Sequence, residues 1–259
     1  MKKSLFATMV AGAILGSSVA AFADQEPLIP APEGKFIGTV TFATQYWFRG
    51  LKQTDDGTGA IQAGIEYDHT SGFYIGAWGS NSSVTQSPLD PNTAKASVEM
   101  DFSGGYRNSF AFDEKATYDI GLNYVYYPGT QKAKYNFDWL DFIGKVGYDF
   151  GFAAPSVKLI YSPDMQYESG SAYYISGDIA VPVTNYFNVT LHGGHQWVDK
   201  NDRFGFPDYS DYGIGVGTNI AGLDVSLNYV GNDLKKSQCA AQVGGGSCDG
   251  FFLTVGKTF

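Results

Sequence analysis

The stretch YDIGLNYVY, residues 118–126, decides the fold class because apolar and polar side chains alternate along it. Every second residue from Tyr118 to Tyr126 is aromatic or aliphatic, and the positions between them include Asp119, Gly121 and Asn123. Successive side chains of a β-strand point to opposite faces, so this period of two predicts a strand with one apolar face.

The same alternation recurs along the chain on both sides of this stretch. Twelve segments show it, and the clearest are residues 98–103, 140–150, 173–181 and 223–229. The sequence is rich in aromatic residues (16%) and glycine (33 residues), a composition typical of strands and turns. We therefore predict an all-β protein of about twelve short antiparallel strands.

The links between the predicted strands alternate in length. The odd-numbered links are long and polar, at about residues 49–59, 80–95, 128–138, 163–171, 199–210 and 231–250. The even-numbered links are shorter, at residues 69–72, 107–115, 151–155, 182–185 and 221–222. A soluble sandwich gives no reason for this alternation, whereas an outer-membrane barrel has long extracellular loops and short periplasmic turns. We therefore predict a transmembrane up-and-down β-barrel over residues 36–259.

The N-terminus has the order of a secretory signal peptide. Lys2 and Lys3 precede an apolar run rich in small residues, which ends at the small-x-small site Ala21-Phe22-Ala23. We expect cleavage after Ala23 and export to the outer membrane of a Gram-negative bacterium. Residues 24–35 contain three prolines and are expected to form an extended periplasmic lead-in.

The charge balance and the hydropathy exclude two classes. Beyond the predicted signal peptide, 15 basic side chains stand against 26 acidic ones, a formal charge of −11, so nucleic acid is not expected as a partner. No window after Ala23 has the roughly eighteen consecutive apolar residues that a membrane-spanning helix needs. The membrane is therefore expected to be crossed by strands.

Aromatic residues gather at both ends of the predicted strands. The four tryptophans fall on the long-loop side and several tyrosines and phenylalanines on the short-turn side, a pattern typical of two girdles at the lipid headgroups. We expect contact with outer-membrane lipid and lipopolysaccharide there. The chain ends in an alternating segment, residues 251–259, which resembles the signal that the barrel-assembly machinery reads. Phe259 is therefore predicted to be an assembly signal.

Several segments resemble one proteobacterial family. The first is YWFRGLKQTD, residues 46–55, and the others are QAGIEY (62–67), GFYIGAWGSN (72–81), EMDF (99–102), YPG (127–129), SPD (162–164) and KTF (257–259). Together they resemble the family catalogued as Gcw_chp, whose members are often labelled TorF-type porins. The resemblance implies an outer-membrane location and a pore. It supplies no catalytic residue and no known solute.

The strand face opposite the apolar side chains carries the charges. A charge facing lipid near the midplane costs about 2–4 kcal/mol, so this face is predicted to line a polar interior. The candidate pore-lining residues are Arg49, Glu66, Asp68, Glu99, Asp101, Arg107, Asp119, Asp141, Lys145, Asp149, Lys158, Asp178 and Asp224. Nine are acidic and four are basic, which predicts a modest preference for cations. The alternative is an ion-pair network that fills a closed, narrow barrel.

Glycines and histidines on the later strands are further candidates for functional residues. Gly213, Gly215 and Gly217 share one inner face and either widen the interior or ease the curvature of the barrel. His192 and His195 fall on opposite faces of one strand, which argues against a shared metal ion. His195 could act with a serine, but no neighbouring segment offers a suitable serine and asparagine at matching depth. We expect no catalytic residue, metal or other cofactor.

The only two cysteines, Cys239 and Cys248, lie in the last long link. In the oxidising compartment that export implies, two cysteines this close are expected to form a disulfide that rigidifies the loop.

Two functions remain open. The favoured one is a channel for small polar solutes. The alternative is a closed barrel that acts through its loops as an adhesin, receptor or structural protein, for which the disulfide-tied loop and residues 80–95 would be the working parts. Twelve strands lie between filled eight-stranded barrels and open sixteen-stranded porins, so the strand number does not separate the two.

Overall fold

The computed structural model describes residues 33–85, 94–131, 133–239 and 248–259. The predicted signal peptide, residues 1–23, and most of the predicted lead-in lie outside the described residues.

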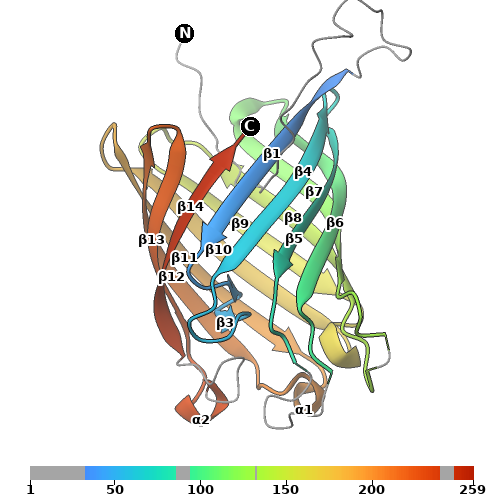
Figure 1. Cartoon of the computed structure of the whole chain (residues 1–259). Coiled ribbons are helices and arrows are strands. Elements are labelled where there is room, and N and C mark those ends of the chain that lie inside the picture. The colour runs from blue at the N-terminus through green and yellow to red at the C-terminus, as the bar shows by residue number, and fades with distance from the viewer. Residues whose placement is uncertain (1–32, 86–93, 132, 240–247) are drawn as a thin grey trace, which may run out of the picture.

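Within that part of the chain, twelve strands close into one antiparallel barrel (Figure 1). In chain order they are β1 (Gly34–Ala43), β4 (Ala60–His69), β5 (Phe73–Asn81), β6 (Val98–Phe110), β7 (Asp113–Tyr126), β8 (Trp139–Tyr148), β9 (Ala154–Ser162), β10 (Ala172–Pro182), β11 (Phe187–Val198), β12 (Tyr209–Ile220), β13 (Leu223–Asn232) and β14 (Asp249–Thr258). Neighbours in this order pair with each other, and β14 pairs with β1, so the sheet has no free edge. The predicted twelve-stranded barrel is confirmed.

The remaining elements are short and lie in the long links. The first long link contains a small hairpin of β2 (Trp47–Phe48) and β3 (Leu51–Lys52). Later links contain η1 (Gln166–Glu168), α1 (Asn201–Phe204) and α2 (Lys236–Cys239). No helix in the described residues is long and apolar enough to cross a membrane.

The outer face of the barrel is apolar. Ile75 and Ile120 are each 65% exposed, and large aliphatic or aromatic side chains are exposed at alternating positions on the other strands. A soluble protein would bury such a surface, whereas a barrel that spans a bilayer presents it to lipid. The inner face therefore carries the polar half of each alternating pattern.

The strand ends differ from the predicted links at two places. Residues 107–115 were predicted as one turn, but β6 continues to Phe110 and β7 begins at Asp113. The two strands pair as far as Phe110 and Asp113, with a register shift between Ser109 and Phe110. The polar residues at these strand ends interrupt the alternation from which strands were predicted. β1 begins at Gly34, two residues before the predicted barrel, because Gly34 and Lys35 pair with His69 and Asp68.

The two predicted aromatic girdles have different outcomes. At the short-turn end, aromatic rings make a contact network on the outer face, for example Phe36 with Tyr67 and Phe73 with Tyr106, each pair with ring centroids 5.0 Å apart. At the long-loop end, Trp197 is 43% exposed on the outer face as predicted, but the prediction is wrong for Trp139 and Trp47. Trp139 is 4% exposed and hydrogen-bonds Asp141 on the inner face, and Trp47 belongs to the β2–β3 hairpin. The position of a tryptophan along a strand does not show which face it occupies.

Candidate functional site

The β2–β3 hairpin folds back toward the barrel wall instead of extending from it (Figure 1). Its two turn residues, Arg49 and Gly50, have φ angles of 47° and 72°. Two successive positive φ angles match the type I′ turn, which suits the twist of a tight hairpin. A side chain at Gly50 would clash, because its Cβ would lie 2.6 Å from Cβ of Asp211 on β12. The turn therefore lies directly against the inner wall.

Arg49 connects the hairpin to strands distant in sequence. Its guanidinium donates to Asp141 Oδ2 on β8 at 2.7 Å and to Gln196 Oε1 on β11 at 2.8 Å. It also stacks over the Tyr174 ring of β10, 4.8 Å from the centroid. The Arg49 and Asp141 side chains are 5% and 4% exposed. A buried pair of this kind needs further hydrogen bonds to offset desolvation, and Trp139 and Ser162 donate to the same carboxylate.

A second contact fixes the base of the hairpin to β6. The Tyr46 hydroxyl donates to Glu99 Oε1 at 2.7 Å, and the Tyr127 hydroxyl donates to Glu99 Oε2 at 2.5 Å. Glu99 is 3% exposed, so the two phenols provide hydrogen bonds that water would otherwise make. Tyr46, Glu99, Tyr127 and the serine that bonds Asp141 all belong to segments that carried the family resemblance. Those segments are dispersed in sequence but meet around one hairpin.

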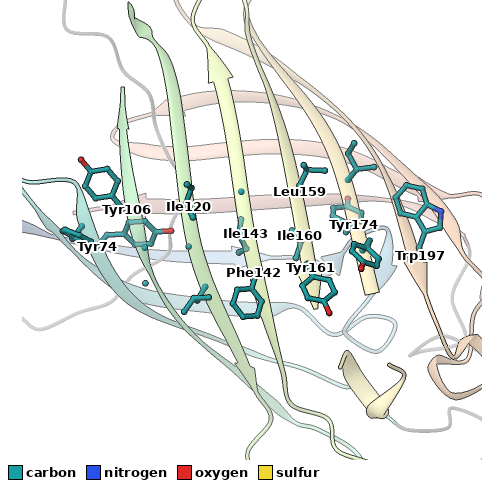
Figure 2. Close-up of a pocket in the computed structure, with 18 residues that line it drawn as sticks. Tyr74, Tyr106, Ile120, Phe142, Ile143, Leu159, Ile160, Tyr161, Tyr174 and Trp197 are labelled. Carbon is teal, nitrogen blue, oxygen red and sulfur yellow. The ribbon is translucent and has the colours of Figure 1, made fainter. Parts of the chain in front are cut away.

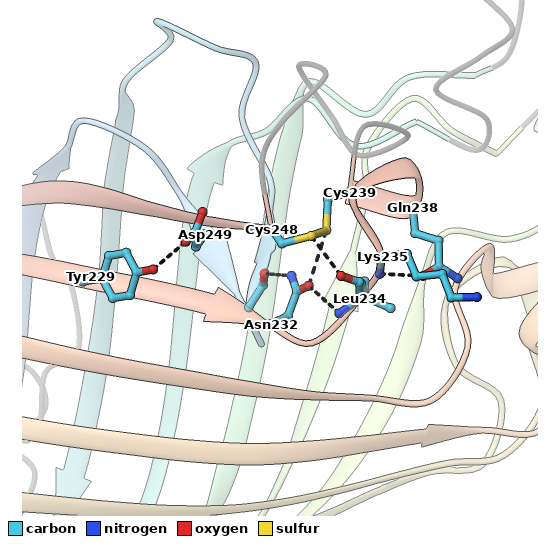
Figure 3. Close-up of a disulfide and its surroundings, with 9 residues drawn as sticks. Tyr229, Asn232, Leu234, Lys235, Gln238, Cys239, Cys248 and Asp249 are labelled. Carbon is cyan, nitrogen blue, oxygen red and sulfur yellow. Dashed lines mark hydrogen bonds between the residues drawn. A yellow bond between two sulfur atoms is a disulfide. The ribbon is translucent and has the colours of Figure 1, made fainter.

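The disulfide-tied last loop contacts the tip of the hairpin through Asn232. Figure 3 shows Asn232 beside Cys239 and Cys248. Asn232, at the end of β13, donates from Nδ2 to the Gly50 carbonyl at 2.7 Å. The same side chain accepts from the Leu234 amide, and the Asn232 amide donates to the Cys248 carbonyl. The predicted Cys239–Cys248 disulfide is confirmed. It closes the loop that positions Asn232 against the hairpin.

Apolar side chains pack the long loops together over this end of the barrel. Leu51 of the hairpin packs in one cluster, whose other buried members are Met165, Ala172, Val198, Phe204, Tyr209, Leu234 and Cys239. A second cluster comprises Val84, Ala96, Val125, Tyr127, Phe137, Trp139 and Tyr167. Lys95 donates to Asp55 at 2.7 Å, and this hydrogen bond holds the pKa of the Asp55 carboxyl below its usual value. The hairpin is thus enclosed by wall and loops.

The inner wall nearer the short turns carries separate ion pairs. Arg107 of β6 contacts Glu66 at 2.5 Å and Asp68 at 3.3 Å, both on β4, and its guanidinium lies over the Tyr74 ring. The Tyr74 hydroxyl donates to Asp119 at 2.9 Å. These four strands are therefore connected across their inner faces by four predicted site residues and by Tyr74 of β5, which was not predicted.

A histidine joins two carboxylates between these regions. His192 Nδ1 lies 2.7 Å from Asp178 of β10, and Nε2 lies 2.7 Å from Asp211 of β12. The Tyr174 hydroxyl also contacts Asp211 at 3.1 Å. Asp211 is a central residue that the sequence analysis missed. It lies two residues before Gly213 and therefore points to the same face of β12 as the glycines. The alternation in the sequence could have identified it as an inward-facing residue.

The other predicted residues are dispersed over the barrel. Asp101 accepts from Asn123 at 2.8 Å, and Asp224 accepts from Asn219 at 2.9 Å near a short turn. Lys145 and Lys158 are partners on neighbouring strands. Asp149 lies in the turn after β8 and accepts from the Gly151 amide, so it is not a strand residue of the wall.

Two of the three inner-face glycines of β12, Gly215 and Gly217, accommodate neighbouring side-chain amides. A Cβ at Gly215 would lie 2.4 Å from Asn228 Oδ1, and one at Gly217 would lie 2.7 Å from Asn188 Oδ1. The space that the missing side chains leave is therefore partly filled by asparagines of β13 and β11. These contacts give the glycines a packing role within the wall.

The outer face provides one catalytic arrangement to consider. His195 Nδ1 lies 2.9 Å from the Ser210 hydroxyl on β12, so a neighbouring strand provides a serine. Among the described residues, no amide or carboxylate hydrogen-bonds the other ring nitrogen of His195. Nucleophile activation requires a third group that orients the base, so this pair lacks the geometry of a hydrolase site. No cluster in the described residues has three side chains suited to a metal ion.

An apolar hollow lies over the lipid-facing side of the wall (Figure 2). Its outward-facing lining includes Ile120, Phe142, Leu159, Tyr161 and Trp197. These side chains are exposed and apolar, as lipid contact requires. Tyr74 and Tyr174 of the inner wall also line the hollow, but its exposed apolar side chains are those of the lipid-facing surface.

Solved structures share this fold. A KdgM porin in complex with disordered oligogalacturonate matches with a TM-score of 0.54 and 6% identity, covering 86% of this chain and 98% of the other. A NanC porin matches with a TM-score of 0.54 and 9% identity, covering 85% and 98%. No curated protein sequence matches this chain.

The closed barrel, its apolar outer face and these neighbours define the class of the protein as an outer-membrane β-barrel with a porin-like fold. The family model described as "Bacterial protein of unknown function (Gcw_chp)" matches residues 30–259. The chain therefore belongs to the Gcw_chp family, as its motifs predicted.

Proposed function

We propose that this chain is an outer-membrane channel for small polar solutes, with a pathway narrowed from the extracellular side by the β2–β3 hairpin. The observation that carries the proposal is the reach of Arg49 from the first long loop to Asp141 and Gln196 on the inner wall. A loop folded inward onto a charged wall narrows a pore and brings its charges close to any passing solute. The long-loop end is taken as extracellular.

The charge balance supports a modest preference for cations. Several inner carboxylates are already paired, including Asp141 with Arg49, and Glu66 and Asp68 with Arg107. Among the described residues, the inward carboxylates with no cation within 4.0 Å are Glu99, Asp101, Asp119 and Asp224. Carboxylates inside low-dielectric walls attract cations and weaken the entry of anions.

Conductance of the purified barrel in a planar bilayer tests the proposal. We expect discrete channels whose conductance rises when Arg49 is replaced by alanine, because the hairpin loses its contacts with β8 and β11. Lys95→Ala is the matched control, since Lys95 is a basic loop residue in an exposed ion pair with Asp55. Absence of channels in both wild type and Arg49→Ala would refute the proposal.

One observation favours a second function. The two apolar clusters join the long loops into a packed surface, as a barrel that acts through its loops would require. A wild type and an Arg49→Ala variant that both lack conductance, together with a cell-binding defect after loop exchange, would support an adhesin, receptor or structural role.

Assembly and export complete the proposal. The backbone of Phe259 pairs with Gly38 of β1, and its ring is 67% exposed. We propose that the barrel-assembly machinery reads this end, that the signal peptide is cleaved after Ala23, and that lipopolysaccharide surrounds the long-loop end.

Deletion of Phe259 should leave protease-sensitive protein in the periplasm, and normal heat-modifiable barrel in the outer membrane would contradict this. N-terminal sequencing should begin at Asp24.

A further inference from the structure

Two lysines face each other on the inner wall. Lys145 of β8 and Lys158 of β9 are register partners, and both point inward. Like charges directly opposite on neighbouring strands repel each other. Among the described residues, no carboxylate oxygen lies within 4.0 Å of either ammonium group. The two ammonium groups are therefore adjacent on the wall without a direct ion pair.

The nearest carboxylates have other partners. Asp119 is the register partner of Lys145 on β7, but it accepts the Tyr74 hydroxyl at 2.9 Å. Asp178 is the next inward-facing residue of β10 after Ser176, which is the register partner of Lys158. His192 Nδ1 lies 2.7 Å from the Asp178 carboxylate. These acids reduce the positive potential at the lysines without forming a direct ion pair with either one.

A buried hydroxyl lies beside the two lysines. Ser176 of β10 is the register partner of Lys158 and points inward. The residue is 2% exposed, and its Oγ has no hydrogen-bond partner. A buried hydroxyl is normally paired, so an unpaired one marks a position where a bound group or water completes the arrangement. This observation is independent of the lysine charges.

We propose that Lys145, Lys158 and Ser176 form a binding subsite for the carboxylate of a small organic acid. Two ammonium groups and one hydroxyl provide donors, and a carboxylate provides two acceptor oxygens. The flanking Asp119 and Asp178 leave too little net positive charge for a dianion, so one carboxylate matches the subsite better than a phosphate ester. Lys145 is exposed although it points inward, so water in the interior reaches the subsite.

This subsite deepens the proposed function because it names a solute class for the same interior. It is compatible with an overall cation preference, since the lysines act locally while the preference reflects all inward charges. The subsite depends on a water-filled interior, whereas conduction also depends on the hairpin. Binding and conduction are therefore measured separately.

Saturation-transfer NMR on the refolded barrel in detergent measures binding without requiring conduction. Gluconate, glucose 6-phosphate and glucose present a carboxylate, a phosphate and no charge on similar frameworks. We expect transfer to gluconate above the other two, and binding about tenfold weaker in Lys145→Gln/Lys158→Gln. Ser176→Ala should weaken gluconate binding less, because one uncharged donor is lost. Lys35→Gln, which removes a lysine at the start of β1, should bind as wild type does.

Two outcomes would overturn the subsite. Equal gluconate transfer in wild type and the double lysine variant would show that the lysines do not bind it. Equal or stronger transfer to glucose 6-phosphate would show a general anion patch in place of a carboxylate subsite. Normal conductance with either result would leave the channel proposal standing, whereas gluconate binding without conductance would refute the channel alone.

Discussion

The two halves of the barrel interior are built in different ways. In the long-loop half, the hairpin packs against the wall, and Arg49 and Asp141 are 5% and 4% exposed. In the short-turn half, the charged side chains belong to the wall itself, and Arg107 and Asp68 remain 27% and 22% exposed, although Glu66 is 5% exposed. In the long-loop half, the Arg49–Asp141 ion pair holds a loop against the wall. In the short-turn half, the ion pairs of Arg107 join neighbouring parts of the wall. We therefore expect passage to be controlled in the long-loop half and solute preference to be set in the other.

Of the changes that test this difference between the two halves, shortening the hairpin should have the largest effect, and it should act on single-channel conductance. Replacing residues 46–53 by a short glycine-serine link should raise single-channel conductance by about threefold or more, since a loop leaves the narrowest part of the pathway. The measurement is single-channel recording in a planar bilayer. Replacing residues 111–112, in the turn between β6 and β7, by glycine and serine is the control, because that turn lies at the other end of the barrel. Unchanged conductance after hairpin removal would show that the two halves do not differ in this way.

Arg49→Ala should also destabilise the long-loop half. The variant leaves Asp141 buried without its cation, which should lower the free energy of unfolding by about 3 kcal/mol. Denaturant titration with the heat-modifiability assay measures it. Arg49→Ala/Asp141→Asn should recover part of the loss, because the buried charge is removed as well. Lys95→Ala removes an exposed pair and should change stability by about 0–1 kcal/mol. Equal losses for Arg49→Ala and Lys95→Ala would contradict the burial argument.

Removing the disulfide should loosen the tip of the hairpin. Cys239→Ser/Cys248→Ser opens a loop of about ten residues, which should cost about 2–3 kcal/mol at most. It should also increase the current fluctuations, because Asn232 is positioned by this loop. Asn232→Ala tests the contact alone, since it removes the donor to Gly50 and keeps the disulfide. If both variants show the wild-type current noise, the last loop does not stabilise the hairpin.

Neutralising wall carboxylates should have the smallest effect. Asp119→Asn/Asp224→Asn removes two charges from the short-turn half and should move the reversal potential under a salt gradient a few millivolts toward zero. Asp141 is unsuitable for this test because it holds Arg49. Salt near 1 M should abolish the difference, since it screens the charges. An anion-selective wild type would contradict the predicted sign.

The alternating pattern predicted the barrel because the residues of each strand show by themselves which side chains face lipid and which face the interior. The hairpin was not predicted, since Arg49 and Gly50 form an uncommon pair for a type I′ turn and the flanking strands have two residues each. Its partners also have no local signal, because Gln196 and Asp141 lie 147 and 92 positions away. Asp211 could have been found, because it shares the facing of Gly213. The inward facing of Arg49 was expected, but its role as a loop anchor depends on tertiary contacts.

The hydrogen bond from Asn232 to Gly50 joins positions separated by 182 residues, and this separation has a kinetic consequence. Contacts of high sequence separation form late, because the loop that they close has a large entropy. The hairpin can reach β8, β11 and β13 only after these strands have joined the wall. Docking of the hairpin is therefore the step that follows closure, and until then the newly closed barrel is at its widest.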